Sequence, residues 1–192
     1  MRGLLAGLLL ALPGAAAAQD VCGGEVTCEI EGGTYMIERP ADDGPVPAVV
    51  FLHGFGGSGE GSMRQSGMVD AFVARGYAVI APDGQARQGG GGLRWDFRPA
   101  EGRGSRDDDA FLTDVVADAA MRHGIDGDEV ILSGFSNGAF LVTYLAGRDP
   151  GAFAAYAPVS GGFWRPHPPG CAGPVRLFQT HGWADSTVPI EG

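Results

Sequence analysis

Residues 130–140 read VILSGFSNGAF. The apolar start of this segment is typical of a buried strand, and the apolar spacing after Gly138 is typical of a helix. Between them, GFSNG places Ser136 at the tip of a tight turn, where Gly134 and Gly138 let the strand and the helix pass close to each other. A serine on such a strand–turn–helix is presented as a nucleophile. Ser136 is therefore the candidate nucleophile, and the alternative is an ordinary turn, because the chain contains 34 glycines.

Strands and helices alternate through the rest of the chain. Continuous apolar runs, typical of parallel strands buried on both faces, occupy residues 48–52, 78–81 and 130–133, with further strands expected at 33–39, 153–159 and 175–180. Helical spacing covers residues 63–75 and the segment from Asp107 to Gly124. This order predicts an α/β fold with a mostly parallel sheet and helices on both faces. Functional residues of such folds lie beyond the carboxyl ends of the strands.

A nucleophilic serine needs a base, and the base needs an orienting acid. In a fold of this kind the acid follows the nucleophile, and a histidine follows the acid. Asp185, in the loop after the strand expected at 175–180, is the candidate acid; the alternative is a turn-forming aspartate.

The base is not evident. The four histidines, His53, His123, His167 and His181, all precede Asp185. His123 ends a predicted helix, which favours a structural role, and His167 and His181 are weaker candidates for the base. We expect the catalytic histidine to lie beyond residue 192, so that the domain over residues 19–192 is incomplete at its C-terminus.

The first buried strand leads into HGFGG at 53–57. Backbone N–H groups in such a loop point into the cleft, and we expect those of Phe55 and Asn137 to stabilise a negative oxygen. A plain turn at the strand end is the alternative. We expect His53, Trp95 and Trp183 to contact substrate, although the long loop at 85–106 that carries Trp95 is equally typical of a surface plug.

The N-terminus has the order of an export signal. Residues 1–18 contain Arg2, an apolar stretch at 4–12 that is too short to span a bilayer, and a final run of alanines. We expect this signal peptide to direct secretion, to the extracellular space or the periplasm. Cys22 and Cys28 suit a small disulfide loop in such a compartment.

Composition limits the partners. The formal net charge is −10, and all 13 basic residues are arginines, which argues against nucleic acid or an anionic membrane as partner. The three cysteines lack the histidine spacing of a zinc site, so we expect no metal.

The chain resembles the secreted poly(3-hydroxybutyrate) depolymerase and feruloyl esterase group of α/β-hydrolases. The matching features follow the order of that family: CGG at 22–24 with Cys28, GTY at 33–35, LHG at 52–54, the predicted helix from Asp109 to Asp126, GFSNG at 134–138, FAA at 153–155 with APV at 157–159, and HG at 181–182 with Asp185 and VP at 188–189. The resemblance implies a carboxylic-ester hydrolase with Ser136 as nucleophile and Asp185 as acid. The histidine of that family normally lies further on, in a glycine-rich stretch.

The sequence thus predicts a secreted serine esterase that needs no cofactor. Its expected substrates are polyhydroxyalkanoates or hydroxycinnamoyl or acetyl esters of polysaccharides. The alternatives are a non-catalytic polymer- or glycan-binding protein on the same scaffold, and a serine peptidase of the same fold.

Overall fold

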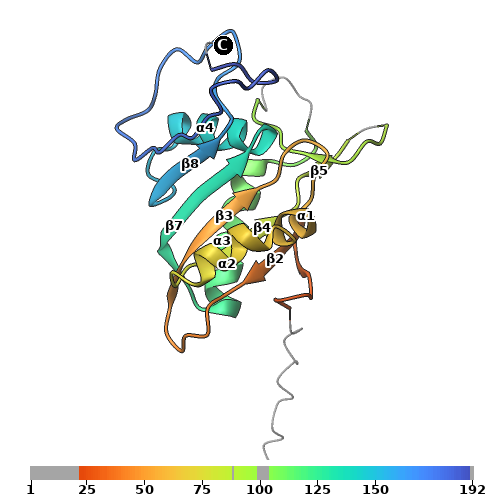
Figure 1. The fold of residues 1–192 in the computed structure, drawn as a ribbon, viewed down its shortest axis with the longest axis vertical. Coiled ribbons are helices and arrows are strands. Elements are labelled where there is room, and N and C mark those ends of the chain that lie inside the picture. The colour runs from red at the N-terminus through yellow and green to blue at the C-terminus, as the bar shows by residue number, and fades with distance from the viewer. Residues whose placement is uncertain (1–21, 88, 99–103, 191–192) are drawn as a thin grey trace, which may run out of the picture.

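A six-stranded sheet forms the centre of the molecule (Figure 1). The computed structural model describes residues 22–87, 89–98 and 104–190, so the predicted signal peptide lies outside the described residues. The strand order is β1-β2-β4-β3-β7-β8, and a separate pair is formed by β5 and β6. The strands are β1 (Cys28–Ile30), β2 (Gly33–Glu38), β3 (Val46–Leu52), β4 (Ala78–Pro82), β5 (Gln85–Ala86), β6 (Leu93–Arg94), β7 (Ile125–Phe135) and β8 (Ala155–Val159).

The four strands that position the candidate site are parallel, and β1 and β2 add an antiparallel edge. This arrangement confirms the predicted α/β fold with its mostly parallel sheet. The carboxyl ends of β3, β7 and β8 meet at one edge, where Leu52 pairs with Gly134 and Phe135 with Val159. The loops that follow these strands therefore converge.

Helices cover both faces of the sheet. Helices α3 (Asp108–His123) and α4 (Asn137–Arg148) share one apolar core with alternate residues of β3, including Val50 and Leu52. Figure 1 shows α1 (Gly59–Met63) and α2 (Ser66–Val73) on the opposite face. Within the described parts of the chain, no helix is both long and apolar enough to cross a bilayer.

The helix expected at residues 63–75 is two short helices. The first begins earlier than predicted because the Ser58 hydroxyl accepts a hydrogen bond from the Gly61 N–H, which caps α1. The chain leaves the helical region at Gln65, whose ψ is 68°, and α2 then begins at Ser66.

The strand expected at residues 175–180 is reduced to two parallel bridges to β8, at Leu177 and Thr180. Arg176 O, Phe178 N and Thr180 N still bond to the β8 backbone. Pro158 is the penultimate residue of β8 and has no N–H to donate, so the ladder is interrupted there.

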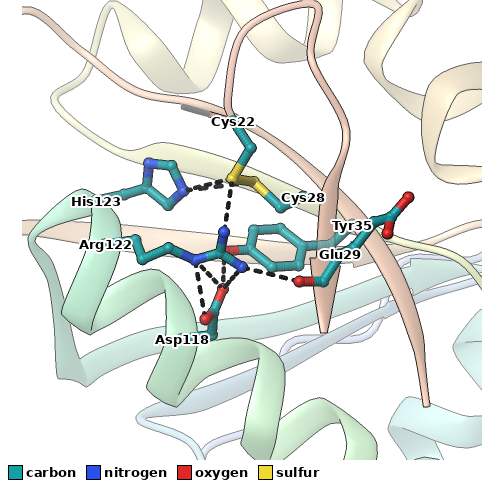
Figure 2. The surroundings of a disulfide bond; sticks show 7 residues. All are labelled: Cys22, Cys28, Glu29, Tyr35, Asp118, Arg122 and His123. Atoms are coloured by element: carbon teal, nitrogen blue, oxygen red, sulfur yellow. Dashed lines mark hydrogen bonds and ion pairs between the residues drawn. A yellow bond between two sulfur atoms is a disulfide. The ribbon is translucent and has the colours of Figure 1, made fainter. Parts of the chain in front are cut away.

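A disulfide joins Cys22 to Cys28 (Figure 2). Nε2 of His123 lies 3.5 Å and 3.4 Å from the two sulfur atoms, and Arg122 donates to the Cys22 sulfur. Arg122 also pairs with Asp118. The N-terminal segment is thereby fixed to the end of α3, which precedes the start of β7 and so lies at the edge of the sheet opposite Ser136.

Removing this disulfide is expected to lower the free energy of unfolding by about 2 kcal/mol, since the loop it closes spans only six positions. The measurement is urea unfolding of a Cys22→Ser, Cys28→Ala double variant. Cys171→Ser is the matched control, because Cys171 is an exposed free thiol. An unchanged unfolding midpoint in the double variant would show that the contacts to α3 alone fix this segment.

Candidate active site

Ser136 stands at the sharp turn between β7 and α4. Its φ is 51° and its ψ is −115°, in a region that serine rarely adopts, and its N–H donates to Val159 O at 3.0 Å. Such a conformation costs about 1–3 kcal/mol and persists only where the surroundings enforce it. The two neighbouring glycines are required by close approach: a Cβ on Gly134 would lie 2.9 Å from the Leu52 Cβ, and one on Gly138 would lie 2.4 Å from Leu52 O. The turn is therefore held against the end of β3.

A cleft of about 940 Å³ opens beside Ser136. Its wall is formed by five segments that follow different strands: Phe55, residues 94–98, the start of α4, residues 161–167, and residues between 179 and 190. The convergence of these loops beyond the strand ends is the arrangement expected for a ligand site in such a sheet.

Both predicted oxyanion residues, Phe55 and Asn137, line this cleft together with Ser136. Asn137 is the first residue of α4, where backbone N–H groups have no partner within the helix and the helix dipole favours negative charge. The sheet thus brings the three residues to one place, and their role as hydrogen-bond donors to an oxyanion stays a prediction.

Asp185 lies directly behind one wall of the cleft. Its Oδ1 accepts hydrogen bonds from the N–H groups of Thr187 at 3.0 Å and Val188 at 2.9 Å, and both of these residues line the cleft. The Val188 and Thr187 bonds hold the pKa of Asp185 below its usual value, with smaller contributions from the Ser160 hydroxyl and His181. The carboxylate is therefore kept ionised, as an orienting acid must be.

Two histidines, His167 and His181, line the cleft. Nε2 of His181 lies 2.6 Å from Val188 O and 3.8 Å from Asp185 Oδ2, which is too long for a hydrogen bond to the carboxylate. His123 lies beside the disulfide instead, which accords with the structural role expected for it. The identity of the base stays a prediction.

The expectation that His53 contacts substrate is wrong. His53 is only 3% exposed and is not among the residues that line the cleft. Its Nε2 accepts the Gly84 N–H, its Nδ1 lies 2.7 Å from Gly54 O, and its carbonyl accepts the Trp95 indole N–H. The ring faces inward, where the N–H of the distant Gly84 and the carbonyl of the neighbouring Gly54 contact its two nitrogens.

Burial of His53 predicts a pH dependence of stability. Desolvation lowers the pKa of His53 below its ordinary value, which is about 6.5. Below about pH 6.5 the unfolded chain binds a proton at this histidine, whereas the folded chain does not. As the pH is lowered, the free energy of unfolding therefore falls by up to about 1.4 kcal/mol per pH unit. Urea unfolding from pH 7 to pH 5 should show a steeper loss for wild type than for His53→Asn. Equal slopes would contradict this account. His123 has a pKa that is lowered in the same direction, but it is present in both proteins and so does not contribute to the difference between their slopes.

Trp95 lies in the cleft wall but is only 1% exposed. The Asn137 side chain holds its backbone from both sides: the Trp95 N–H donates to Asn137 Oδ1 at 2.7 Å, and Asn137 Nδ2 donates to Trp95 O at 3.1 Å. Trp95 therefore shapes the cleft mainly as a buried anchor, and little of its ring is available to a substrate.

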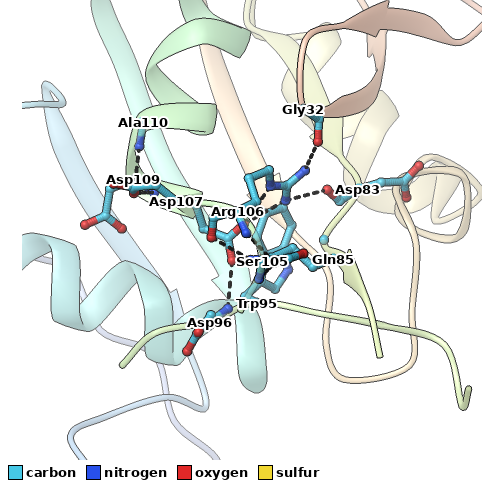
Figure 3. A network of polar contacts seen from close by, with 12 residues as sticks. Gly32, Asp83, Gln85, Trp95, Asp96, Ser105, Arg106, Asp107, Asp109 and Ala110 are labelled. Carbon is cyan, nitrogen blue, oxygen red and sulfur yellow. Dashed lines mark hydrogen bonds and ion pairs between the residues drawn. The ribbon is translucent and has the colours of Figure 1, made fainter. Parts of the chain in front are cut away.

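A buried ion pair fixes the same loop from the other side (Figure 3). The Arg106 guanidinium bonds to Asp108, Asp83 O and Gly32 O, and the Asp108 carboxylate accepts the Asp96 N–H at 2.7 Å. The Asp108 side chain is fully buried. Residues 95 and 96 are thus tied both to the nucleophile turn and to the start of α3.

Replacing Asn137 by alanine is expected to lower the free energy of unfolding by about 2–4 kcal/mol, because two buried backbone groups of Trp95 lose their partners. Urea unfolding and tryptophan fluorescence would report the change. Thr143→Ala is a suitable control, since that hydroxyl donates a hydrogen bond within α4, to Ala139 O. A loss no larger than that of the control would show that the loop does not depend on the Asn137 amide.

Trp183 does not line the cleft: it is 86% exposed and lies outside the wall, contrary to expectation. Three other aromatic residues of the wall, Phe97, Phe140 and Trp164, form a cluster whose rings lie 5.2–5.8 Å apart. The sequence indicates two of these rings: Phe97 alternates with charged residues in a long loop, and Trp164 lies in an irregular segment near the expected position of the cleft. Phe140 reads as an ordinary core residue of a helix.

The profile of the α/β hydrolase fold family matches residues 47–189. The chain belongs to this family.

Its relatives include esterases. NocK of Nocardia uniformis subsp. tsuyamanensis, a proposed esterase, is 33% identical over 150 residues, which are 76% of this chain and 42% of NocK. Poly(3-hydroxyalkanoate) depolymerase C of Paucimonas lemoignei is 28% identical over 116 residues, which are 60% of this chain and 28% of that protein. The chain thus spans less than half the length of either relative.

The acetyl xylan esterase from Aspergillus awamori has a similar structure, with a TM-score of 0.63 at 20% identity over 83% of this chain and 70% of that one. This likeness is one of fold.

Proposed function

We propose that the chain is the catalytic part of a secreted serine carboxylic-ester hydrolase. The observation that carries this proposal is the strained Ser136 turn, which opens onto a cleft that also contains Phe55 and Asn137. Secretion is supported by the order of residues 1–18 and by the Cys22–Cys28 disulfide.

In the proposed reaction Ser136 Oγ attacks the ester carbonyl while a histidine base takes its proton. The N–H groups of Phe55 and Asn137 hold the negative oxygen, and Asp185 orients the base. The alcohol leaves with the proton, and water then attacks the acyl-enzyme and releases the acid. These steps need no cofactor.

We propose a hydroxyalkanoate polyester, or a hydroxycinnamoyl or acetyl ester of a polysaccharide, as the substrate. The depolymerase relative supports the first class, and the open cleft is compatible with either.

The test is covalent labelling. Protein expressed from its complete gene should react with a fluorophosphonate at Ser136, identified by peptide mass, and should hydrolyse p-nitrophenyl butyrate. Labelling elsewhere, or hydrolysis that a saturating fluorophosphonate leaves intact, would overturn the proposal.

A further inference from the structure

The loop that carries Asp185 extends away from the sheet, and most residues from 182 to 188 are exposed. Its own hydrogen bonds are local. The Asp185 N–H donates to Gly182 O at 3.1 Å, and the carboxylate accepts the N–H groups of Thr187 and Val188. Such bonds fix the shape of the loop but not its place relative to the nucleophile. The position of the acid therefore depends on contacts that tie the loop to the sheet.

His181 connects the start of this loop to its end. It follows Thr180, whose N–H donates to Pro158 O and whose carbonyl accepts the Ser160 N–H, so the backbone before the ring is fixed to β8. The His181 side chain is 6% exposed, and its Nε2 lies 2.6 Å from Val188 O. The N–H of the same Val188 donates to the acid. A path of contacts thus runs from β8 through the imidazole and residue 188 to the carboxylate.

The imidazole acts in this path as a donor. A carbonyl oxygen only accepts hydrogen bonds, so the contact with Val188 O requires the proton of His181 to be on Nε2. The other ring nitrogen, Nδ1, is buried, and the described part of the chain offers it no hydrogen-bond partner. A general base must take a proton on a nitrogen that the nucleophile can reach. Because Nε2 is occupied and Nδ1 is covered, the geometry suits positioning and not proton transfer.

We propose that His181 is a positioning residue for the acid: through Val188 it holds the Asp185 carboxylate where the base meets it. The inference rests on the proposed ester hydrolysis with Asp185 as acid, and it adds a residue to that site. Without the imidazole donor the loop keeps its internal bonds but can shift as a unit, and a displacement of about 1 Å can cost about 100-fold in rate. The Ser160 hydroxyl also bonds to the carboxylate, so the loss should be smaller than that caused by removing the charge of Asp185.

Two substitutions of His181 separate the donor from the rest of the ring. The amide nitrogen of glutamine is as many bonds from Cα as Nε2 of histidine, whereas the amide nitrogen of asparagine corresponds to Nδ1. His181→Asn should therefore lower kcat for p-nitrophenyl butyrate by about 10- to 100-fold in protein expressed from its complete gene. His181→Gln should stay within about threefold of wild type, because a donor to Val188 O is restored. Urea unfolding of both variants should give similar midpoints.

Double variants show whether the effect passes through the acid. In an Asp185→Asn background, His181→Asn should cause almost no further loss of kcat, since the charge that it positions is already gone. In an Asp126→Asn background it should cause its full loss, because Asp126 stands near the start of β7. A general loss of stability would lower kcat in both backgrounds alike.

Three results would overturn the inference. Equal losses in His181→Gln and His181→Asn would mean that the imidazole itself takes part in the chemistry. An Asn variant with wild-type kcat would show that the loop is held by other contacts. An undiminished loss in the Asp185→Asn background would show that His181 does not act through the acid.

Hydrogen exchange separates this inference from the proposed chemistry. Millisecond exchange at the amides of Thr187 and Val188, read by peptide mass, should be faster in His181→Asn than in wild type and in His181→Gln. If the wild type hydrolyses no ester but this difference is found, the proposed hydrolysis fails and the positioning role stands. The same exchange rates in all three proteins would contradict the positioning role, whatever the activity.

Discussion

Replacing Ser136 by alanine will lower kcat for p-nitrophenyl butyrate by about 10⁴- to 10⁶-fold. The reason is that the hydroxyl is the atom that forms the bond to the acyl group, and no other group in the turn replaces it. The alanine variant should fold, because the strained conformation is imposed by the Val159 and Leu52 contacts of the turn and does not depend on the hydroxyl.

The control for this substitution is Ser133→Ala. Ser133 lies three residues earlier on β7, and its hydroxyl donates to Ala157 O at 2.7 Å, away from the cleft. The control loses a hydrogen bond within the sheet but should keep its turnover. Full turnover in Ser136→Ala would exclude the serine mechanism, and equal losses in both variants would indicate a folding defect.

Replacing Asp185 by asparagine will lower kcat by about 10³- to 10⁴-fold with little change in stability. An asparagine oxygen can still accept the Thr187 and Val188 N–H groups that Asp185 Oδ1 accepts, so the loop should keep its shape. What is lost is the negative charge that orients and stabilises the protonated base.

Asp126→Asn is the matched control for the acid. Asp126 also accepts a backbone N–H two residues further on, from Asp128, but it stands near the start of β7, at the opposite edge of the sheet. Turnover should be measured with p-nitrophenyl butyrate, and stability by urea unfolding. If Asp185→Asn retains more than a tenth of wild-type kcat, Asp185 is a turn residue and the acid lies elsewhere.

The central part of the fold was predictable because its signals are local. The apolar runs that became β3, β4 and β7 are continuous, and the turn at Ser136 is marked by the two glycines that its close contacts require. Asp107 likewise caps α3, at the residue where the helical segment was expected to begin. Each of these features is decided by residues that are neighbours in the sequence.

The errors concern contacts between distant segments. The inward position of His53 depends on the Gly84 N–H, and the burial of Trp95 depends on the Asn137 side chain; neither pairing leaves a periodic signal. The early start of α1 was readable from Ser58, and the interrupted pairing of residues 175–180 was readable from Pro158, because both effects follow from the residue type alone.

Strand β8 links the proposed nucleophile, Ser136, to the loop of the proposed acid, Asp185, through a single peptide unit. Val159 O accepts the Ser136 N–H, and the next residue, Ser160, donates its N–H to Thr180 O at 2.9 Å, just before the loop of Asp185. A displacement of β8 along its own axis would carry the nucleophile and the acid in the same direction. The position of Ser136 relative to Asp185 should therefore change little when the edge of the sheet fluctuates.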